Sequence, residues 1–381
     1  MSDRRFALVA GGGTAGHLQP ALAVAEALVA GGRPRTSIEF VGSRRGQDRV
    51  VLADRGFPFT LLPGRGVVRS LRPADLARNV AALAGIVWGV VLAVGIVLRA
   101  RPSVVVAVGG YASVPASLAA VVTGVPLVLV NVDAVPGAAN RLLGRFARAS
   151  AVGWEGTPLP RAVVTGTPVR PEIAAVGRGP ADRAAAREQL GLPTGRTTVA
   201  AFGGSLGARR INTAVSDLAV RWKDRDDLAV YHVIGRRDWD EAAEAGRHHS
   251  DDDGLCYRRV PYDERMALVY SAADVVVSRA GAMTVAELAL AGVPAVLVPL
   301  PGAPGDHQTA NARVLERAGA ARLRPDASCD GPALAADLDR LTADRPALEA
   351  MGRAARSLGR PDAADAAARL VEEHARRGGR R

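Results

Sequence analysis

The sequence has 381 residues, which is long for one domain and enough for two domains that each bury a core. Its net charge of +11, from 49 basic and 38 acidic residues, favours anionic partners such as phosphates or acidic lipid headgroups, although basic residues that only decorate a solvated surface would give the same balance. Aromatic residues are only 4% and the basic residues form no binding motif, which argues against nucleic acid, and the two cysteines lack metal-ligand or redox spacing, which fits a reducing compartment.

The first apolar run, residues 6–10 (FALVA), is too short for the core of a signal peptide and predicts a buried strand. We therefore expect a cytoplasmic location. The run leads into the turn GGGTAG and a helical pattern over about 20–29, and a second apolar run at 198–202 leads into GGSLGA and a helical pattern from about residue 210. Strand, glycine-rich turn and helix in this order open a doubly wound α/β sheet, so two such sheets are expected.

Further short apolar runs predict additional buried strands, separated by helical segments. They lie at 38–41, 104–108, 126–130, 229–234, 274–277 and 295–298. Prolines and a glycine interrupt both periodicities at 165–171 (TGTPVRP), which predicts a linker. The expected organisation is one domain over 1–165, a second over 166–355, and a C-terminal segment over 356–381 whose helix packs back toward the first domain and ends in a basic tail.

The segment 79–98 (NVAALAGIVWGVVLAVGIVL) has no charged residue and reaches the length of a transmembrane helix. Arginines flank it at positions 65, 69, 72, 78, 99 and 101. A spanning helix would separate two parts of the first sheet, because the strand expected at 104–108 follows directly. We therefore favour a helix that lies against the core and a lipid surface, with a buried helix and a span as the alternatives.

Two glycine-rich turns carry the candidate chemistry. The G-x-G-x-x-G pattern at 11–16 lets backbone N–H groups approach a phosphate, as in dinucleotide sites. Such sites also need an acidic residue at the tip of the second strand, where this chain has GSRR at 42–45, while Glu39 lies inside the strand and His17 is foreign to the fingerprint. A nicotinamide-dependent oxidoreductase is thus an alternative with little support.

The second half carries SRAGAMTVAE at 278–287 and DHQ at 306–308. A turn that opens a helix can hold a diphosphate on its backbone amides, Glu287 can bind a ribose diol, and His307 and Gln308 can contact sugar hydroxyls. A helix start whose glutamate only complements the helix dipole would show the same pattern.

The chain resembles the MurG family of glycosyltransferases in a series of motifs that run in order from about residue 6 to 375. They are GGGTAGHLQPALAVAEAL, VGGYASVPASLAA, AVPGAANRL, TGTPVR, GGSLGARRIN, SRAGAMTVAELALAGVPAVLVP and DHQTANA. The resemblance implies transfer of N-acetylglucosamine (GlcNAc) from UDP-GlcNAc to undecaprenyl-diphospho-N-acetylmuramoyl-pentapeptide (lipid I), which forms lipid II for peptidoglycan. It also implies an α/β GT-B fold, in which two doubly wound Rossmann-like domains face each other across a cleft. The acceptor and the membrane would bind the N-terminal domain, and the UDP-sugar the C-terminal one.

The resemblance places site residues on both domains. The catalytic candidates are His17 and Asp133. The acceptor-side candidates are Thr14, Ala15, Gly16, Tyr111 and Asn131. The donor-side candidates are Arg170, Ser205, Asn212, Arg279, Met283, Thr284, Glu287, His307 and Gln308.

Two stretches depart from the family pattern. The family carries His-Glu-Gln-Asn before the AVPG motif, where this chain has Val130-Asn131-Val132-Asp133, so the identity of the general base and the choice of acceptor are open. The loop on the uracil side reads Tyr262-Asp263-Glu264-Arg265, where an apolar residue follows the aromatic one in the family.

The resemblance implies an inverting, single-displacement reaction in which the C4 hydroxyl of the muramoyl sugar attacks the anomeric carbon as UDP leaves. Helix N-termini and Arg170 would stabilise the leaving diphosphate, so we expect neither a metal nor a cofactor. His17 is the leading base, since a neutral imidazole is available near pH 7, and Asp133 is the alternative. The expected partners are UDP-GlcNAc, the undecaprenyl-linked acceptor and anionic lipids at the cytoplasmic face of the cell membrane. A transferase with another lipid acceptor and a UDP-sugar epimerase are the rival functions.

Overall fold

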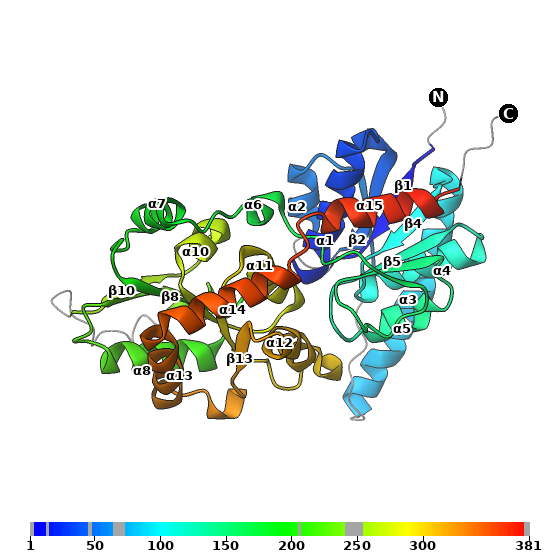
Figure 1. Ribbon diagram of the computed structural model, residues 1–381. Coiled ribbons are helices and arrows are strands. Elements are labelled where there is room, and N and C mark those ends of the chain that lie inside the picture. Colours follow the sequence, from blue (N-terminus) through cyan, green and yellow to red (C-terminus); the bar gives the residue numbers. More distant parts are fainter. Residues whose placement is uncertain are drawn as a thin grey trace. The chain divides into compact units, whose positions relative to one another are not determined.

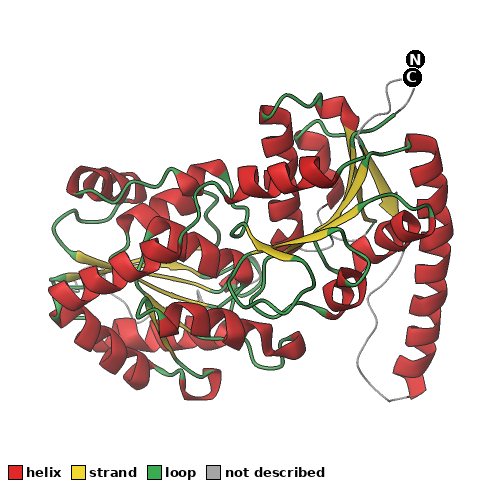
Figure 2. Ribbon diagram, turned by 45° about the vertical axis from the view of Figure 1, so that its right-hand side comes forward, coloured by secondary structure: helices red, strands yellow, loops and turns green. Residues whose placement is uncertain are grey.

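The computed structural model describes residues 4–12, 15–44, 48–63, 73–204, 207–240 and 254–376, without the side chains of Ala15 and residues 73–84. The chain forms two compact units (Figure 1). Unit 1 comprises Met1–Arg170 together with Asp362–Arg381, and unit 2 comprises Pro171–Pro361. Each unit is a parallel sheet with helices on both faces (Figure 2).

Unit 1 contains a seven-stranded sheet in the order β3-β2-β1-β4-β5-β6-β7, in which every neighbouring pair is parallel. Its strands are β1 (Ala7–Ala10), β2 (Ile38–Ser43), β3 (Phe59–Leu62), β4 (Val104–Ala107), β5 (Leu127–Asn131), β6 (Ala149–Val152) and β7 (Ala162–Val164). Its helices are α1 (Ala15–Ala30), α2 (Asp48–Asp54), α3 (Pro73–Ala100), α4 (Val114–Val122), α5 (Ala138–Gly144) and α15 (Ala363–His374).

Unit 2 contains a six-stranded sheet in the order β10-β9-β8-β11-β12-β13, also parallel throughout. Its strands are β8 (Thr197–Phe202), β9 (Leu228–Val233), β10 (Cys256–Val260), β11 (Val275–Ser278), β12 (Ala295–Leu297) and β13 (Ala321–Leu323). Its helices are α6 (Pro171–Ala174), α7 (Pro180–Leu190), α8 (Arg209–Arg221), α10 (Met266–Ala272), α11 (Ala282–Ala291), α12 (His307–Arg317), α13 (Gly331–Ala343) and α14 (Arg345–Leu358).

Both sheets reverse their strand order at the first strand of the unit, between β1 and β4 and between β8 and β11. Ligands of doubly wound sheets bind beyond the carboxyl ends of the strands at such a switch point. The topology therefore marks one candidate site in each unit: the loops after β1 and β4, and the loops after β8 and β11.

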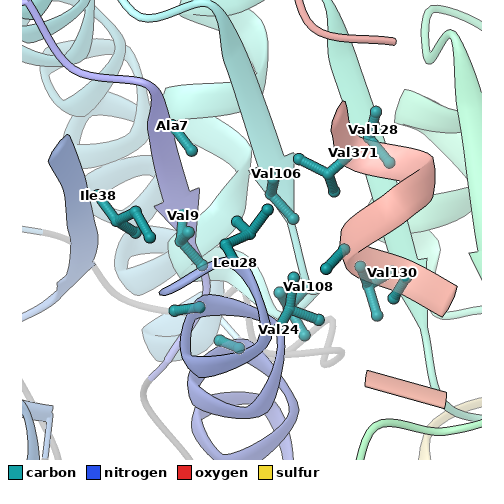
Figure 3. Packing of buried hydrophobic residues seen from close by; sticks show 14 of the residues in the cluster. Ala7, Val9, Val24, Leu28, Ile38, Val106, Val108, Val128, Val130 and Val371 are labelled. Carbon is teal, nitrogen blue, oxygen red and sulfur yellow. The ribbon is translucent and has the colours of Figure 1, made fainter. Parts of the chain in front are cut away.

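The sheet of unit 1 is buried on both faces, which explains its continuous apolar strands. On one face, Val24 and Leu28 of α1 and Val371 of α15 pack onto Val9, Val106 and Val128 (Figure 3). On the other face, α3 and α4 cover Leu8, Val105 and Leu127. The C-terminal helix thus completes the core of unit 1, although it follows unit 2 in the sequence.

Helix α3 contains the whole apolar segment that the sequence analysis singled out. Its C-terminal half buries Ala93, Ile96 and Val97 against the sheet, and Gly89 lies where a Cβ atom would come within 3.2 Å of Pro115 in α4. Its outer face exposes a stripe of large apolar side chains, between 54% and 62% accessible: Val87, Trp88, Val91 and Leu98. Within the described ranges, no helix combines the length and the apolar character needed to cross a membrane.

The sequence analysis located eight strands, and the structure has a strand at each of these places. It did not identify five others, namely β3, β6, β7, β10 and β13. These strands have only three to five residues, and all except β6 are partly or fully exposed over much of their length, so they lack the apolar run of a central strand.

Candidate active site

In unit 1, the glycines after β4 form a seat for the ring of His17. Gly109 and Gly110 have φ angles of +101° and +73°, which favour glycine. A Cβ atom on Gly109 would lie 3.1 Å from Cδ2 of His17 and 3.4 Å from Nδ2 of Asn140, and one on Gly110 would lie 3.3 Å from Nδ1 of His17. The imidazole, in the first turn of α1, therefore packs directly against backbone at the switch point and close to the Asn140 amide.

A buried carboxylate supports the loop after β1. Asp48, at the start of α2, accepts a hydrogen bond from the backbone N–H of Ser43 at 2.9 Å, and the Ser43 hydroxyl bonds the Tyr111 hydroxyl at 2.7 Å. Gly12 has a φ angle of +142°, and any Cβ atom there would overlap the Asp48 carboxylate. These contacts tie the ends of β1, β2 and β4 together and hold Tyr111 at the carboxyl edge of the sheet.

The stretch that departs from the family pattern lies at the end of β5. The side-chain amide of Asn131 is 3% exposed; its Nδ2 donates to the carbonyl of Asp133 at 2.7 Å and its Oδ1 accepts from Nδ2 of Asn140 at 3.0 Å. Asn131 thereby shapes the turn that carries Asp133, which is half-buried. Oδ1 of Asn140 is buried and has no hydrogen-bond partner among the described residues.

In unit 2, helix α11 begins at the switch point. Its N-cap residue, Gly281, is extended, and no described side chain caps the first backbone N–H groups. Helices α8, α10 and α12 likewise have no side-chain cap among the described residues, whereas α13 and α14 are capped by the carboxylates of Asp330 and Asp344. An uncapped helix N-terminus at the carboxyl edge of a parallel sheet is suited to bind a diphosphate. Met283 and Thr284 lie in this first turn, both half-buried.

Glu287 lies in the second turn of α11 and is 8% exposed. Its Oε2 accepts a hydrogen bond of 2.8 Å from the hydroxyl of Tyr270, a fully buried residue of α10. This bond fixes the orientation of the carboxylate.

The loop after β12 brings His307 and Gln308 to the same edge. Oε1 of Gln308 accepts from the backbone N–H of Leu300 at 2.9 Å, and Nδ1 of His307 lies 2.8 Å from the carbonyl of Pro304. Arg279, directly after β11, donates to the Asp326 carboxylate at 2.6 Å and to the carbonyl oxygens of Val298 and Pro299. Arg279 therefore also braces the loops that follow β11 and β12.

Asn212 belongs to a buried polar chain under the loop that enters α8. Its Nδ2 donates to the carbonyl of Ile234 at 3.1 Å, and its Oδ1 lies 3.1 Å from Nε2 of His232, whose Nδ1 lies 2.9 Å from the Tyr257 hydroxyl. Burial, with a smaller contribution from the nearby Arg259, lowers the pKa of His232 to about 3. The ring is thus neutral, with its hydrogen on Nε2, because an amide oxygen can only accept. Gly207 approaches the same Ile234 carbonyl so closely that it has no room for a side chain.

The second departure from the family pattern is a supported turn. Asp263 accepts hydrogen bonds from the Tyr231 hydroxyl at 2.6 Å and from the backbone and side chain of Arg265. Burial alone would raise the pKa of Asp263, but these bonds from Arg265 and Tyr231 outweigh it and lower the pKa. The carboxylate therefore has a structural role, while Tyr262 is exposed beneath the guanidinium of Arg236.

Most residues that the sequence analysis selected lie at the carboxyl edge of one sheet or the other. Gly16, His17, Tyr111, Asn131 and Asp133 do so in unit 1, and Arg279, Met283, Thr284, Glu287, His307 and Gln308 in unit 2. Asn212 lies buried in α8, and Arg170 is the last residue of the first segment of unit 1. Thr14 and Ser205 lie outside the described residues, and Ala15 is described only as the first residue of α1.

Sequence reasoning missed Asp48, Asn140, His232 and Tyr270, which hold the selected residues in place. Asn140 had a detectable signal, because it closes the AVPGAAN motif, whereas nothing in the sequence links His232 to Asn212 or Tyr270 to Glu287.

Glu39 explains why the glycine fingerprint of unit 1 does not extend to a dinucleotide site. Its carboxylate pairs with Arg5 at 3.1 Å and Arg99 at 3.2 Å and accepts from the Thr60 hydroxyl at 2.9 Å. It is the second residue of β2 and therefore lies near the amino edge of the sheet, away from the loop after β1. Within the described ranges, no group of three or more His, Cys, Asp and Glu side chains could hold a metal ion.

The chain is similar to known proteins over nearly its whole length. Residues 7–152 match the glycosyltransferase family 28 N-terminal domain, and residues 198–367 match the family 28 C-terminal domain. It is 42% identical to the UDP-N-acetylglucosamine--N-acetylmuramyl-(pentapeptide) pyrophosphoryl-undecaprenol N-acetylglucosamine transferase of Alkalilimnicola ehrlichii, with 97% of this chain and 99% of the relative aligned. The enzyme of the same name from Acidothermus cellulolyticus is 41% identical, with 97% of both chains aligned. The crystal structure of Acinetobacter baumannii MurG has a TM-score of 0.77 and 29% identity and covers 97% of this chain and 99% of that one.

Proposed function

This chain belongs to the MurG family of glycosyltransferase family 28, and we infer that it transfers GlcNAc from UDP-GlcNAc to lipid I, forming lipid II for peptidoglycan synthesis. The observation that carries this function is the 42% identity to a transferase of that name over 97% of the chain. The fold is the GT-B arrangement of two Rossmann-like units.

For the donor, we propose that unit 2 binds UDP-GlcNAc at its switch point. The uncapped N-terminus of α11 supports this assignment, because its backbone N–H groups and the helix dipole favour a diphosphate. Glu287, held by Tyr270, would bind the ribose diol, and Gln308 and His307 would contact the GlcNAc hydroxyls. The proposed donor set also includes Arg170, Ser205, Arg279, Met283 and Thr284. Asn212 would support the loop that enters α8 through its buried hydrogen bonds.

For the acceptor, we propose that the diphosphate and the muramoyl sugar bind at the switch point of unit 1. The candidates are Thr14, Ala15, Gly16, Tyr111 and Asn131. His17 is the proposed general base: it would accept the proton of the muramoyl C4 hydroxyl as that oxygen bonds to the anomeric carbon and the bond to UDP breaks. The seat formed by Gly109 and Gly110 and the nearby Asn140 would orient its ring. Asp133, on the turn shaped by Asn131, is the alternative base.

We further propose that α3 brings unit 1 to the cytoplasmic face of the membrane. Trp88, Val91 and Leu98 follow one another at helical spacing, and with Val87 they form an exposed apolar stripe. Arg99 and Arg101 are exposed at the end of this helix, and Arg99 also pairs with Glu39. The arginines at 65, 69, 72 and 78 lie outside the described side chains. Apolar insertion together with attraction of arginines to anionic headgroups would give reversible peripheral binding.

The direct test is incubation of the purified protein with UDP-GlcNAc labelled in the sugar and with lipid I, followed by separation of the lipid fraction. Transfer predicts labelled lipid II and an equal amount of UDP, both absent when lipid I is omitted. Label that appears only as free GlcNAc, or that enters undecaprenyl lipids other than lipid I at a higher rate, would contradict the proposed acceptor and favour the rival transferase.

A further inference from the structure

Unit 2 contains a polar cavity that includes none of the residues proposed to bind the donor. It has a volume of about 630 Å³ and lies among α7, α14 and the loops that enter β8, β11 and β12. Most of its lining comes from one face of α7, which carries Arg183, Ala184 and Arg187, and from α14, which carries Arg345, Arg353 and Arg356. Both helices are labelled in Figure 1.

The cavity lies at the amino edge of the sheet, opposite to the proposed donor site. Asp274, in its wall, directly precedes β11, and Pro294 directly precedes β12, whereas Arg279 of the proposed donor set follows β11. The four residues of β11 separate the two edges by about 13 Å. A ligand in this cavity would therefore not block the proposed donor site.

The lining has a large excess of positive charge. Six arginines and two carboxylates, Asp274 and Glu349, face the cavity. Asp274 already accepts hydrogen bonds from Arg183, from Arg187 and from the backbone N–H of Thr198. Glu349 pairs with Arg345 at 3.3 Å.

Three of the six arginines have no carboxylate partner among the described residues. Within the described part of the chain, Arg178 donates only to the carbonyl oxygens of Tyr270 and Ala273, and Arg356 only to that of Ala291. The guanidinium of Arg353 is exposed at the cavity and makes no hydrogen bond or ion pair in the described structure. Burial is the main cause that lowers the pKa of Arg178 to about 9, and repulsion from Arg183, which reflects the unbalanced positive charge, adds to it. A bound anion would remove this imbalance.

Guanidinium groups form paired hydrogen bonds to the oxygens of phosphate groups, and a cluster of them selects anions with more than one charge. No aromatic side chain in the part of unit 2 that the structure describes lines the cavity to stack a nucleobase. The large apolar side chains exposed on the described surface of unit 2 are Val220, Tyr262 and Leu300, and none of them lines the cavity, so a lipid would find no apolar rim. We propose that this cavity is a second anion site of unit 2, which binds a small soluble diphosphate or phosphate ester independently of the UDP-sugar.

The test is calorimetric titration of inorganic pyrophosphate into the full-length protein at fixed ionic strength, with the donor site saturated by UDP. We expect about one pyrophosphate per chain. Arg353→Gln should weaken its binding about tenfold, because it removes a charged donor that has no structural partner. Ala184→Phe, which fills the cavity without changing the charge, should abolish binding. Arg221→Gln, the same charge change on the exposed end of α8, should leave it unchanged.

Titration of UDP into each variant provides the folding control, because a correctly folded unit 2 retains its UDP affinity. Absence of pyrophosphate binding in the presence of UDP would overturn the proposal. Equal pyrophosphate affinities for wild type, Arg353→Gln and Ala184→Phe would also overturn it, because binding would then occur elsewhere. Neither result would affect the proposed transfer of GlcNAc, which is measured in a separate assay.

Discussion

At the scale of single residues, His17 and Asp133 are the two side chains proposed to take the acceptor proton. We expect His17→Ala to reduce kcat by about two to four orders of magnitude, because loss of a general base removes that much of the acceleration. Asp133→Asn keeps the size and the polarity of the side chain and should have a much smaller effect. Initial rates of lipid II formation measure both, and the reverse pattern would assign the base to Asp133.

His232 makes the stability of unit 2 sensitive to acid. Its pKa is about 3 in the folded protein, against about 6.5 in an unfolded chain, so the unfolded state binds more protons between these values. The contribution of the neutral His232 ring to the free energy of unfolding should therefore be complete above pH 6.5. It should decrease by up to about 1.4 kcal/mol per pH unit as the pH falls toward 3. Urea unfolding of wild type and of His232→Gln, which cannot titrate, measures this contribution. Equal pH slopes for the two proteins between pH 6 and 4 would contradict it.

The sequence identifies the candidate residues that belong to recognisable motifs, such as His17, Tyr111, Glu287 and Gln308. It does not identify the residues that position them, because those contacts join segments far apart in the chain. His232 meets Asn212 only because β9 and α8 belong to one hydrophobic core, and Tyr270 reaches Glu287 only because α10 lies beside α11. Periodicity carries no information about such pairs.

At the scale of elements, α3 is the one proposed to bind the membrane. Replacing Val87, Trp88 and Val91 with serine should lower the affinity for anionic vesicles at low salt at least tenfold, as measured by co-sedimentation. The reason is that each side chain buried in the interface contributes about 1.5–3 kcal/mol. The triple variant changes Val87 and not its neighbour Ile86, because Val87 is 62% exposed whereas Ile86 is half-buried.

The matched control is Val122→Ser, an exposed valine at the end of α4 that lies outside the stripe. UDP affinity should be the same in all three proteins, and high salt should release much of the bound wild type. Unchanged sedimentation of the α3 variant would remove this helix from the membrane contact. Retention of the wild type through high-salt and carbonate washes would favour a spanning segment.

The central elements could be predicted from sequence because each is a continuous apolar run followed by a glycine-rich turn. The strands at or near the sheet edges could not, because β7 and β13 have three residues each, and their exposure removes the hydrophobic pattern. Helix α3 shows a related difficulty. Its composition suits a membrane helix, a core helix or an interfacial helix equally, and only packing shows that Ile96 and Val97 face the core while Trp88 and Val91 do not.

At the scale of the whole molecule, the two units share one strand order and differ in what they place at the switch point. In unit 1, the imidazole of His17 packs against two glycines. In unit 2, the N-terminus of α11 has no side-chain cap among the described residues, and the Glu287 carboxylate is held by a hydrogen bond. The first arrangement suits proton transfer and the second suits binding of a nucleoside diphosphate. We therefore propose that the chemistry depends on unit 1 and the binding of the donor on unit 2.

Calorimetric titration of UDP into wild type, His17→Ala and Glu287→Gln tests this claim most directly, with Glu316→Gln on the exposed face of α12 as the charge-matched control. His17→Ala should bind UDP as tightly as wild type even though it forms lipid II far more slowly. Glu287→Gln should bind UDP about ten to a hundred times more weakly, because the ribose diol loses a hydrogen bond to a charged group that is worth about 1.5–3 kcal/mol. Unchanged UDP affinity in Glu287→Gln, or an equal loss of UDP affinity in His17→Ala, would contradict the assignment of the donor to unit 2.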